Sequence, residues 1–168
     1  DLLIIKGKYQ ERPRPPFSPG LEISGIIQEK GSNVSNLQIG DKVMSIMKYG
    51  GYKTEVIVPK ENTYLAPKNM GILEAGGFPV IYGTAFSAIK TKAKLKKNEV
   101  CVILGATGGV GMAAIEIAKA YGAIVVACGG NDKKLDVCTE KGADYTINYN
   151  NKIIRKELKN LGLIEIDV

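Results

Sequence analysis

Residues 100–121 constrain the fold of this chain more than any other segment. Val100–Leu104 is an uninterrupted apolar run, residues 109–121 have helical spacing, and the glycine-rich stretch 105–111 joins them. A strand without polar alternation is typical of a parallel sheet with both faces covered. Because parallel strands need crossover connections, this segment predicts an α/β fold in which a glycine turn joins a strand to a helix.

The same alternation continues toward the end of the chain. We expect strands at 123–127 and 144–148, helices at 132–141 and 152–160, and a fourth strand at 163–168. Apolar strands that alternate with helices in this way predict the first part of a doubly wound parallel (Rossmann) sheet.

The first half of the chain is rich in short strands and turns. The prolines within residues 12–16 favour extended backbone, because each proline fixes its own φ and restricts the residue before it. Strands are expected at 21–29, 42–47 and 54–58, separated by glycine-containing turns. This pattern indicates a small, barrel-like β domain.

A change of periodicity separates the two halves. Helices are expected at 72–75 and 83–89, with a break at Pro79 between them. We therefore expect a first domain of residues 1–82 and a second domain of residues 83–168.

Both ends of the sequence lie beside or within expected elements. Asp1 is followed at once by the apolar run Leu2–Ile5, and residues 163–168 have a strand pattern. We expect the chain to be a fragment that is truncated at both ends.

Histidine is absent from the 168 residues, which removes the commonest zinc ligand and the commonest general base near neutral pH. The three cysteines, Cys101, Cys128 and Cys138, are odd in number and have no CxxC spacing. We therefore expect neither a metal site nor a disulfide framework. A reducing compartment follows, with the cytoplasm as the expectation and the mitochondrion as the alternative.

The chain carries a formal net charge of +6, and its densest basic stretch is residues 90–97. No aromatic side chains are interleaved there to stack on bases, so a solvated helix end is favoured over a nucleic-acid site. No apolar run reaches the roughly 18 residues of a membrane-spanning helix. We expect neither nucleic acid nor a membrane as a partner.

The glycine loop has the features of a diphosphate site. Gly105 and Gly108 carry no side chain, so the backbone can approach a pyrophosphate, and Gly111 lets the helix pack closely on the strand. The G-x-x-G-x-x-G spacing is not followed by the Lys-Ser/Thr pair of a P-loop. The loop favours a dinucleotide, and the alternative is a tight turn with a structural role alone.

The residues after the second strand of this sheet indicate which cofactor is bound. Residues 127–131 include no Asp or Glu to bind a ribose 2′-hydroxyl, and Lys133 and Lys134 follow them. Ammonium groups at this place can pair with a 2′-phosphate, so NADPH is favoured over NADH. Asp132 weakens the positive field, and the alternative is that the lysines only solvate an exposed helix.

Five segments carry a family resemblance: residues 16–25, 39–43, 78–85, 105–111 and 141–144. Over nearly the whole chain the sequence resembles the zinc-free NADPH:quinone oxidoreductases, the zeta-crystallin-like branch of the medium-chain dehydrogenase/reductase superfamily. The resemblance implies a partial GroES-like β-barrel domain in front of the Rossmann sheet. Zinc-dependent relatives have Gly-His-Glu where this sequence has Gly20-Leu21-Glu22, which agrees with the absence of histidine.

The resemblance also implies that glycine-loop residues line the pyrophosphate, that residues after the next two strands surround the 2′-phosphate, and that one hydroxyl meets the nicotinamide. With the loop's first glycine, the candidate cofactor-binding residues are Thr84, Gly105, Gly108, Gly109, Val110, Gly111, Gly130, Lys134 and Tyr149. As alternatives, Thr84 caps a helix and Tyr149 is a half-buried aromatic at a strand end.

The implied activity is zinc-independent hydride transfer from NADPH to a quinone or an α,β-unsaturated carbonyl, in a protein that is a homo-oligomer at full length. The cofactor supplies the chemistry, so we assign no catalytic residue. Phe17, Leu21 and Tyr52 are candidates for an apolar wall against a planar substrate, although core packing explains Phe17 and Leu21 as well. A substrate-lining tyrosine of some relatives falls at Leu3, which leaves Tyr9 or Tyr52 for that role.

Two other functions stay open. An enoyl-thioester reductase shares the same motifs, and a non-catalytic relative with a structural or nucleotide-sensing role would keep the glycine loop. By itself the chain is expected to bind NADPH weakly if at all and to turn over poorly, because it ends within the expected fourth strand and most of the nicotinamide half of such a site is missing.

Overall fold

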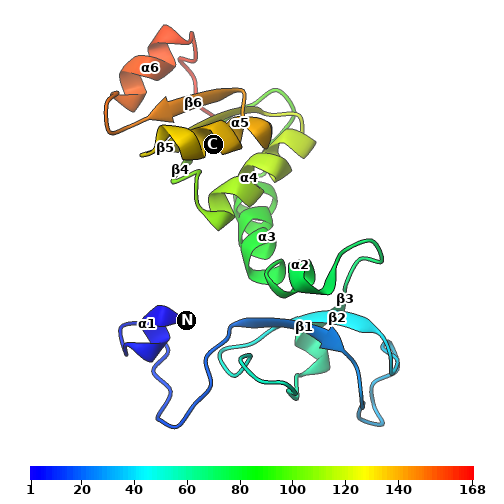
Figure 1. The fold of residues 1–168 in the computed structure, drawn as a ribbon. Helices are drawn as coiled ribbons and strands as arrows, with labels where there is room; N and C mark the ends of the chain where they lie inside the picture. The colour runs from blue at the N-terminus through cyan, green and yellow to red at the C-terminus, as the bar shows by residue number, and fades with distance from the viewer. The chain divides into compact units, whose positions relative to one another are not determined.

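The computed structural model describes all 168 residues of the chain, which divides into two compact units, Asp1–Val80 and Ile81–Val168 (Figure 1). Each unit has its own sheet, antiparallel in the first and parallel in the second. None of the helices combines the length and the hydropathy that crossing a membrane requires.

The first unit is built on three antiparallel strands, β1 (Glu22–Ile26), β2 (Lys42–Ile46) and β3 (Thr63–Leu65), which pair in that order. Alternate residues of a strand share a face, and Val43 and Ser45 of the central strand β2 are both buried. One face of the sheet therefore points into the unit.

Short helices flank this sheet. They are α1 (Leu2–Ile5), the 3-10 helix η1 (Lys60–Asn62) and α2 (Ile72–Gly76). The helix expected just before Pro79 is confirmed as α2. It packs on β1, where the Ser24 hydroxyl donates to the carbonyl oxygen of Ile72.

The strand expected at residues 54–58 is wrong. That segment has no strand partner, and Ile57 is 99% exposed. The edge of β2 is occupied instead by β3, whose Thr63 is buried beside Ser45. The Ser45 hydroxyl donates to Asn62 at 2.8 Å, so the chain just before β3 is fixed to β2 by a buried polar contact. Pairing and burial, more than β propensity, decide which segment joins a sheet.

The helix expected at 83–89 begins earlier, at Pro79, so the break expected between the two helices lies directly before the proline. α3 (Pro79–Phe86) starts at the proline and continues as a π-helical segment, η2 (Ser87–Lys92). Proline is well tolerated in the first turn, because its missing N–H needs no partner there. Thr84 consequently lies inside α3, which excludes the alternative that it caps a helix.

The second unit has a parallel sheet in the order β4 (Val100–Leu104), β5 (Ile124–Gly129) and β6 (Tyr145–Asn148) (Figure 1). All three strands were expected within a residue or two of these bounds. Their parallel pairing and their apolar sequences confirm the α/β fold class with a Rossmann-type sheet.

Helices cover both faces of this sheet. α4 (Gly109–Ala120) and α5 (Asp132–Glu140) pack on the face that carries Cys101, Val125 and Ala127. α6 (Ile154–Asn160) packs on the opposite face through Ile154 and Leu158, against side chains that include Val126 and Ile147. Coverage on two faces explains why the strands are apolar without alternation.

The fourth strand expected at 163–168 does not form. The last residue, Val168, accepts a hydrogen bond from Val102 N at 2.8 Å and donates to Val100 O at 3.2 Å, which is the pattern of parallel pairing. The pairing does not extend, because the N–H of Val100 is taken by the Asp167 carboxylate at 2.8 Å.

Candidate functional site

The glycine loop connects β4 to α4 in a turn that favours glycine at its first position. Gly105 has a φ of +66°, a region that favours glycine, and its carbonyl oxygen accepts from Gly108 N at 3.1 Å. Ala106 N donates to Cys128 O of the neighbouring strand at 3.0 Å. The loop is therefore fixed to the carboxyl end of the sheet.

Gly111 is required by packing. A Cβ at this position would lie 2.6 Å from both Ala106 Cα and Gly105 O, and these are backbone atoms that cannot turn away. At Gly109 the Cβ would lie 3.1 Å from Cδ1 of Ile81, on α3. The first turn of α4 thus rests directly on the loop, as expected from the glycine spacing.

The start of α4 presents unpaired backbone donors. Gly108 is the N-cap residue and provides no side-chain acceptor. The next three residues, Gly109, Val110 and Gly111, have amides without acceptors inside the helix. This turn contains no acidic and no basic side chain. Gly108, Gly109 and Val110 are exposed. Free amides at the positive end of a helix dipole form a binding site for an anion such as a diphosphate, and we call the site formed by Gly109, Val110 and Gly111 the anion seat.

A second group of candidate residues meets at the ends of β5 and β6. Gly130 lies against the ring of Tyr149, since a Cβ on Gly130 would be 3.1 Å from Tyr149 Cε2. Tyr149 is 46% exposed and its amide donates to Gly129 O at 3.1 Å. Gly129 is buried, and a Cβ added there would be 2.7 Å from Cγ2 of Thr107 in the glycine loop. The two candidate groups are thereby joined through Gly129.

The N-terminus of α5 is capped by Asn131, whose side chain accepts from Lys134 N at 3.1 Å. Asp132 follows, and its carboxylate accepts from Asn148 Nδ2 at 2.7 Å. The side chains of Lys133 and Lys134 are in the exposed first turn of the helix. Two amides and one carboxylate therefore lie at or just beyond the ends of β5 and β6, and two lysines follow in the same helical turn.

Thr84 lies apart from the ends of β5 and β6, on α3. It is exposed and follows Ile81 by one helical turn, so it belongs to the helix that contacts Gly109. Sequence reasoning missed Thr107, Asn148 and Asn150. Nothing marks the Thr107 methyl group in advance, whereas the position of Asn148 at the carboxyl end of an expected parallel strand was a usable signal.

A polar network behind the glycine loop joins three helices of the second unit. The Tyr82 hydroxyl of α3 donates to Glu116 of α4, which also accepts from Lys141 Nζ at 2.7 Å. The hydrogen bond to Glu116 raises the pKa of Tyr82 and also that of Lys141. Partial burial opposes ionisation of Glu116, but its two hydrogen bonds outweigh burial and lower its pKa.

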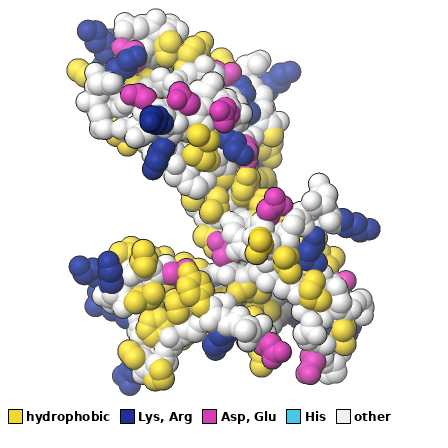
Figure 2. All heavy atoms as spheres, in the orientation of Figure 1, with side chains coloured by type: hydrophobic (Ala, Val, Ile, Leu, Met, Phe, Trp, Pro, Cys, Tyr) yellow, Lys and Arg dark blue, Asp and Glu magenta, His cyan; other side chains and the backbone are white.

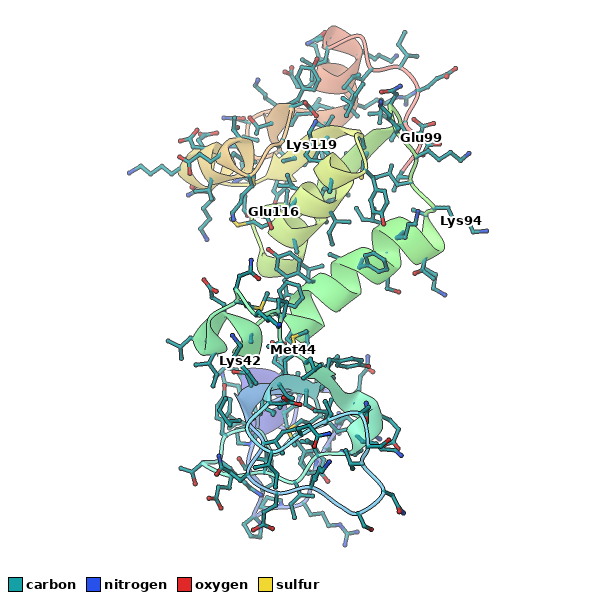
Figure 3. All side chains as sticks on the ribbon, turned by 90° about the vertical axis from the view of Figure 1, so that its right-hand side faces the viewer. Lys42, Met44, Lys94, Glu99, Glu116 and Lys119 are labelled. Carbon is teal, nitrogen blue, oxygen red and sulfur yellow. The ribbon has the colours of Figure 1, made fainter.

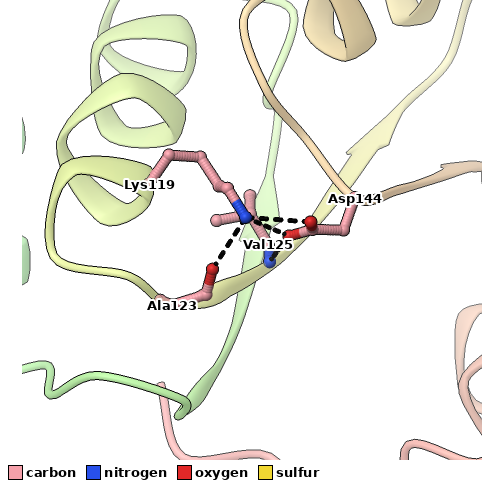
Figure 4. Close-up of polar contacts among 4 residues, drawn as sticks. All are labelled: Lys119, Ala123, Val125 and Asp144. Atoms are coloured by element: carbon pink, nitrogen blue, oxygen red, sulfur yellow. Dashed lines mark hydrogen bonds and ion pairs between the residues drawn. The ribbon is translucent and has the colours of Figure 1, made fainter.

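A second polar cluster braces the opposite end of the sheet (Figure 4). Lys119 Nζ lies 2.7 and 2.8 Å from the two oxygens of Asp144 and donates to Ala123 O at 3.0 Å. The same carboxylate accepts from Val125 N at 2.7 Å. Partial burial would raise the pKa of Asp144, but the hydrogen bonds from Lys119 and Val125 lower it. This cluster connects the end of α4 to the start of β5.

The basic stretch 90–97 has contacts typical of a helix end (Figure 3). Lys90 Nζ lies 4.5 Å from the ring centroid of Tyr121, and Lys96 Nζ lies 3.8 Å from Glu99. Lys94 follows the π-helical segment with a φ of +56°, so the helix stops there.

The first unit contains an open hollow of about 540 Å³. Phe17 and Tyr49 lie in its wall with ring centroids 6.3 Å apart and an interplanar angle of 75°. Of the three residues expected in an apolar wall, only Phe17 lines this hollow; Leu21 and Tyr52 do not. The Tyr52 hydroxyl donates instead to Asp1 at 3.1 Å.

Hydrophobic side chains also gather over α1, where Leu2, Leu3 and Ile5 are exposed (Figure 2).

Two family signatures match this chain. Residues 1–82 match the alcohol dehydrogenase GroES-like domain, and residues 109–167 match the zinc-binding dehydrogenase domain. The chain belongs to the medium-chain dehydrogenase/reductase superfamily. This membership confirms the superfamily and the fold class expected from the sequence.

Individual proteins similar to this chain include quinone oxidoreductases and an enoyl reductase. The chain is 33% identical over 162 residues to quinone oxidoreductase-like protein 2 of Mus musculus, covering 96% of this chain and 46% of that protein. The crystal structure of Escherichia coli quinone oxidoreductase complexed with NADPH matches with a TM-score of 0.87 and 27% identity, over 99% of this chain and 51% of that one. CurK enoyl reductase matches with a TM-score of 0.84 and 26% identity, over 98% and 50%. The chain spans about half the length of these proteins.

Proposed function

We propose that this chain is the NADPH-binding and substrate-facing part of a zinc-independent oxidoreductase that reduces a quinone or a related α,β-unsaturated carbonyl. The observation that carries the proposal is the anion seat at the start of α4. Its three free amides, at Gly109, Val110 and Gly111, belong to a helix start that packs on the glycine loop so closely that a Cβ at Gly111 would meet backbone atoms at 2.6 Å. Similarity to quinone oxidoreductases, one of them solved with NADPH, supports the same conclusion.

The residues at the end of β5 fit the 2′-phosphate of NADPH. Gly130 packs closely against the exposed ring of Tyr149, where a side chain would press on that ring, and Lys134 carries an ammonium group in the first turn of α5. No carboxylate stands on the strand end itself, where it would bind a ribose hydroxyl. These features support NADPH over NADH.

Zinc independence is supported by the side chains that are present. The chain has no histidine, and Leu21 stands between Gly20 and Glu22 where zinc-dependent relatives have histidine. All three cysteines are buried, and burial raises the pKa of Cys101 and of Cys128 to about 11. A thiol with a raised pKa is a poor zinc ligand, because zinc binds the thiolate.

When bound, the nicotinamide cofactor supplies the hydride. The chain's own residues would hold the diphosphate through the backbone amides of α4 and the 2′-phosphate through Lys134, which would orient the adenosine half of the cofactor. We propose that the hollow beside Phe17 and Tyr49 offers the apolar wall for a planar substrate. We assign no proton donor.

The proposal is tested by titrating the protein with NADPH and NADH while nicotinamide fluorescence is followed. Enhancement by NADPH at lower concentration than by NADH supports it, and equal response or none contradicts the cofactor assignment. Oxidation of NADPH after 9,10-phenanthrenequinone is added supports quinone reduction.

A second candidate, reduction of an unsaturated acyl thioester, is favoured by the likeness to CurK enoyl reductase. An acyl thioester that is turned over faster than the quinone would favour this function. Binding of NADPH without any product would instead favour the non-catalytic alternative.

A further inference from the structure

Asp132 is the acidic residue nearest to the end of β5. It follows Gly129 by three positions and begins α5. In sheets of this type, an acid near the end of the second strand accepts hydrogen bonds from the ribose 2′-hydroxyl and repels a 2′-phosphate. A free Asp132 would therefore favour NADH and oppose the proposed preference for NADPH.

Asp132 is not free, because Asn148 Nδ2 donates to its carboxylate at 2.7 Å from the end of β6. The Asn148 amide is itself oriented: its Oδ1 accepts from Asn150 N at 3.0 Å, which leaves the Nδ2 group directed at Asp132. Asn150 in turn donates to Gly130 O at 2.7 Å. These contacts form a continuous chain of hydrogen bonds around the place proposed for the 2′-phosphate.

We infer that Asn148 is a positioning residue that selects the 2′-phosphorylated cofactor by holding the Asp132 carboxylate against the end of β6. The hydrogen bond from Asn148 occupies one acceptor site of the Asp132 carboxylate, and β6, not the ligand, fixes the position of that carboxylate. Lys133 and Lys134, in the same turn of α5, then provide the charged groups left to meet the ligand. This inference rests on the proposed function and names the residue that sets its cofactor preference.

A purely structural role for Asn148 would give a different result. Asn148 also accepts from Asn150 N, so its loss could loosen the loop for every nucleotide alike. A role through Asp132 must instead change the ratio between two nucleotides that differ only in the 2′-phosphate. The change in this ratio must also disappear when the charge of Asp132 is removed.

The experiment uses the 168-residue chain and two probes, adenosine 2′,5′-bisphosphate and adenosine 5′-monophosphate, with affinities measured by isothermal titration calorimetry. Asn148→Ala is expected to lower the preference for the bisphosphate about fivefold, the effect of one unfavourable charge at an exposed site. Adding Asp132→Asn to this variant is expected to restore the preference. Adding Asp136→Asn is the matched control, because it removes an exposed acid one turn further along α5, and it is expected to restore little.

Each outcome decides the inference. If the unmodified chain shows no preference for the bisphosphate, the proposed cofactor is wrong. If that preference is present but Asn148→Ala weakens both probes equally, or if Asp132→Asn restores nothing, the role of Asn148 is overturned while the proposed function stands. Should Asn148→Ala fail to fold, Asn148→Ser keeps an acceptor for Asn150 N but is too short to reach Asp132, and the same ratio is measured on it.

Discussion

Replacing Gly111 with alanine tests whether the glycine loop is required by packing. The added Cβ would lie 2.6 Å from Ala106 Cα and Gly105 O, although real Cβ atoms essentially never approach other atoms below 3.0 Å. Overpacking of this kind costs about 1–3 kcal/mol, and the upper end applies because the obstructing atoms are backbone. Alanine regains about 1 kcal/mol of helix propensity, so we expect a net loss of about 2 kcal/mol.

The matched control is Gly83→Ala. Gly83 also lies in a helix, α3, but a Cβ there has no atom within 4 Å. We expect this variant to be as stable as the unmodified chain or more stable by up to about 1 kcal/mol.

Thermal unfolding followed by circular dichroism measures the difference between the two variants. For a unit the size of residues 81–168, a loss of about 2 kcal/mol lowers Tm by about 10 °C. NADPH affinity should fall about tenfold in Gly111→Ala, because the displaced first turn loses one charge-assisted hydrogen bond. If both variants were equally stable and bound NADPH equally well, the packing argument and the proposed anion seat would both be refuted.

Three further predictions follow from the second unit. Asp144→Asn should lower the free energy of unfolding by about 1 kcal/mol at pH 7. Because the folded-state pKa of Asp144 is lowered, the difference from the unmodified chain should shrink as pH falls below about 4. Urea unfolding at pH 7 and pH 3.5 measures this change. Lys134→Gln should weaken NADPH binding about fivefold and leave NADH binding nearly unchanged, and added salt should reduce this difference in calorimetry. The three cysteines should react with a thiol reagent only after unfolding, because they are buried with raised pKa values; rapid labelling of the native chain at pH 8 would contradict this.

The parallel sheet was predictable because its signals are local. Val100–Leu104 is apolar without interruption, and the structure has β4 at those residues. The start of α5 was also predicted at Asp132, where Asn131 provides the cap. Each of these features depends on neighbours within one strand or one helical turn, which a single sequence contains.

The errors concern pairing between distant residues. Residues 54–58 have strand composition, but β2 pairs with β3, where Thr63 is buried beside Ser45. Residues 163–168 have strand composition too, but the Asp167 carboxylate takes the N–H of Val100 that a longer ladder would need. Propensity indicates that a segment can form a strand, whereas the donors and acceptors of another strand decide whether it does.

The candidate site divides in the same way. Glycine spacing predicts the loop because the positive φ of Gly105 favours glycine and the packing of Gly111 requires it, and the sequence pattern reflects both directly. The Asp132–Asn148 contact leaves no such pattern, because it joins residues at or just beyond the carboxyl ends of two adjacent parallel strands, Asp132 at the start of α5 and Asn148 at the end of β6. A parallel sheet brings such ends to one edge whatever lies between them. Residues that tune a site of this kind are therefore best sought at the carboxyl ends of neighbouring strands, and not within the motif that first marks the site.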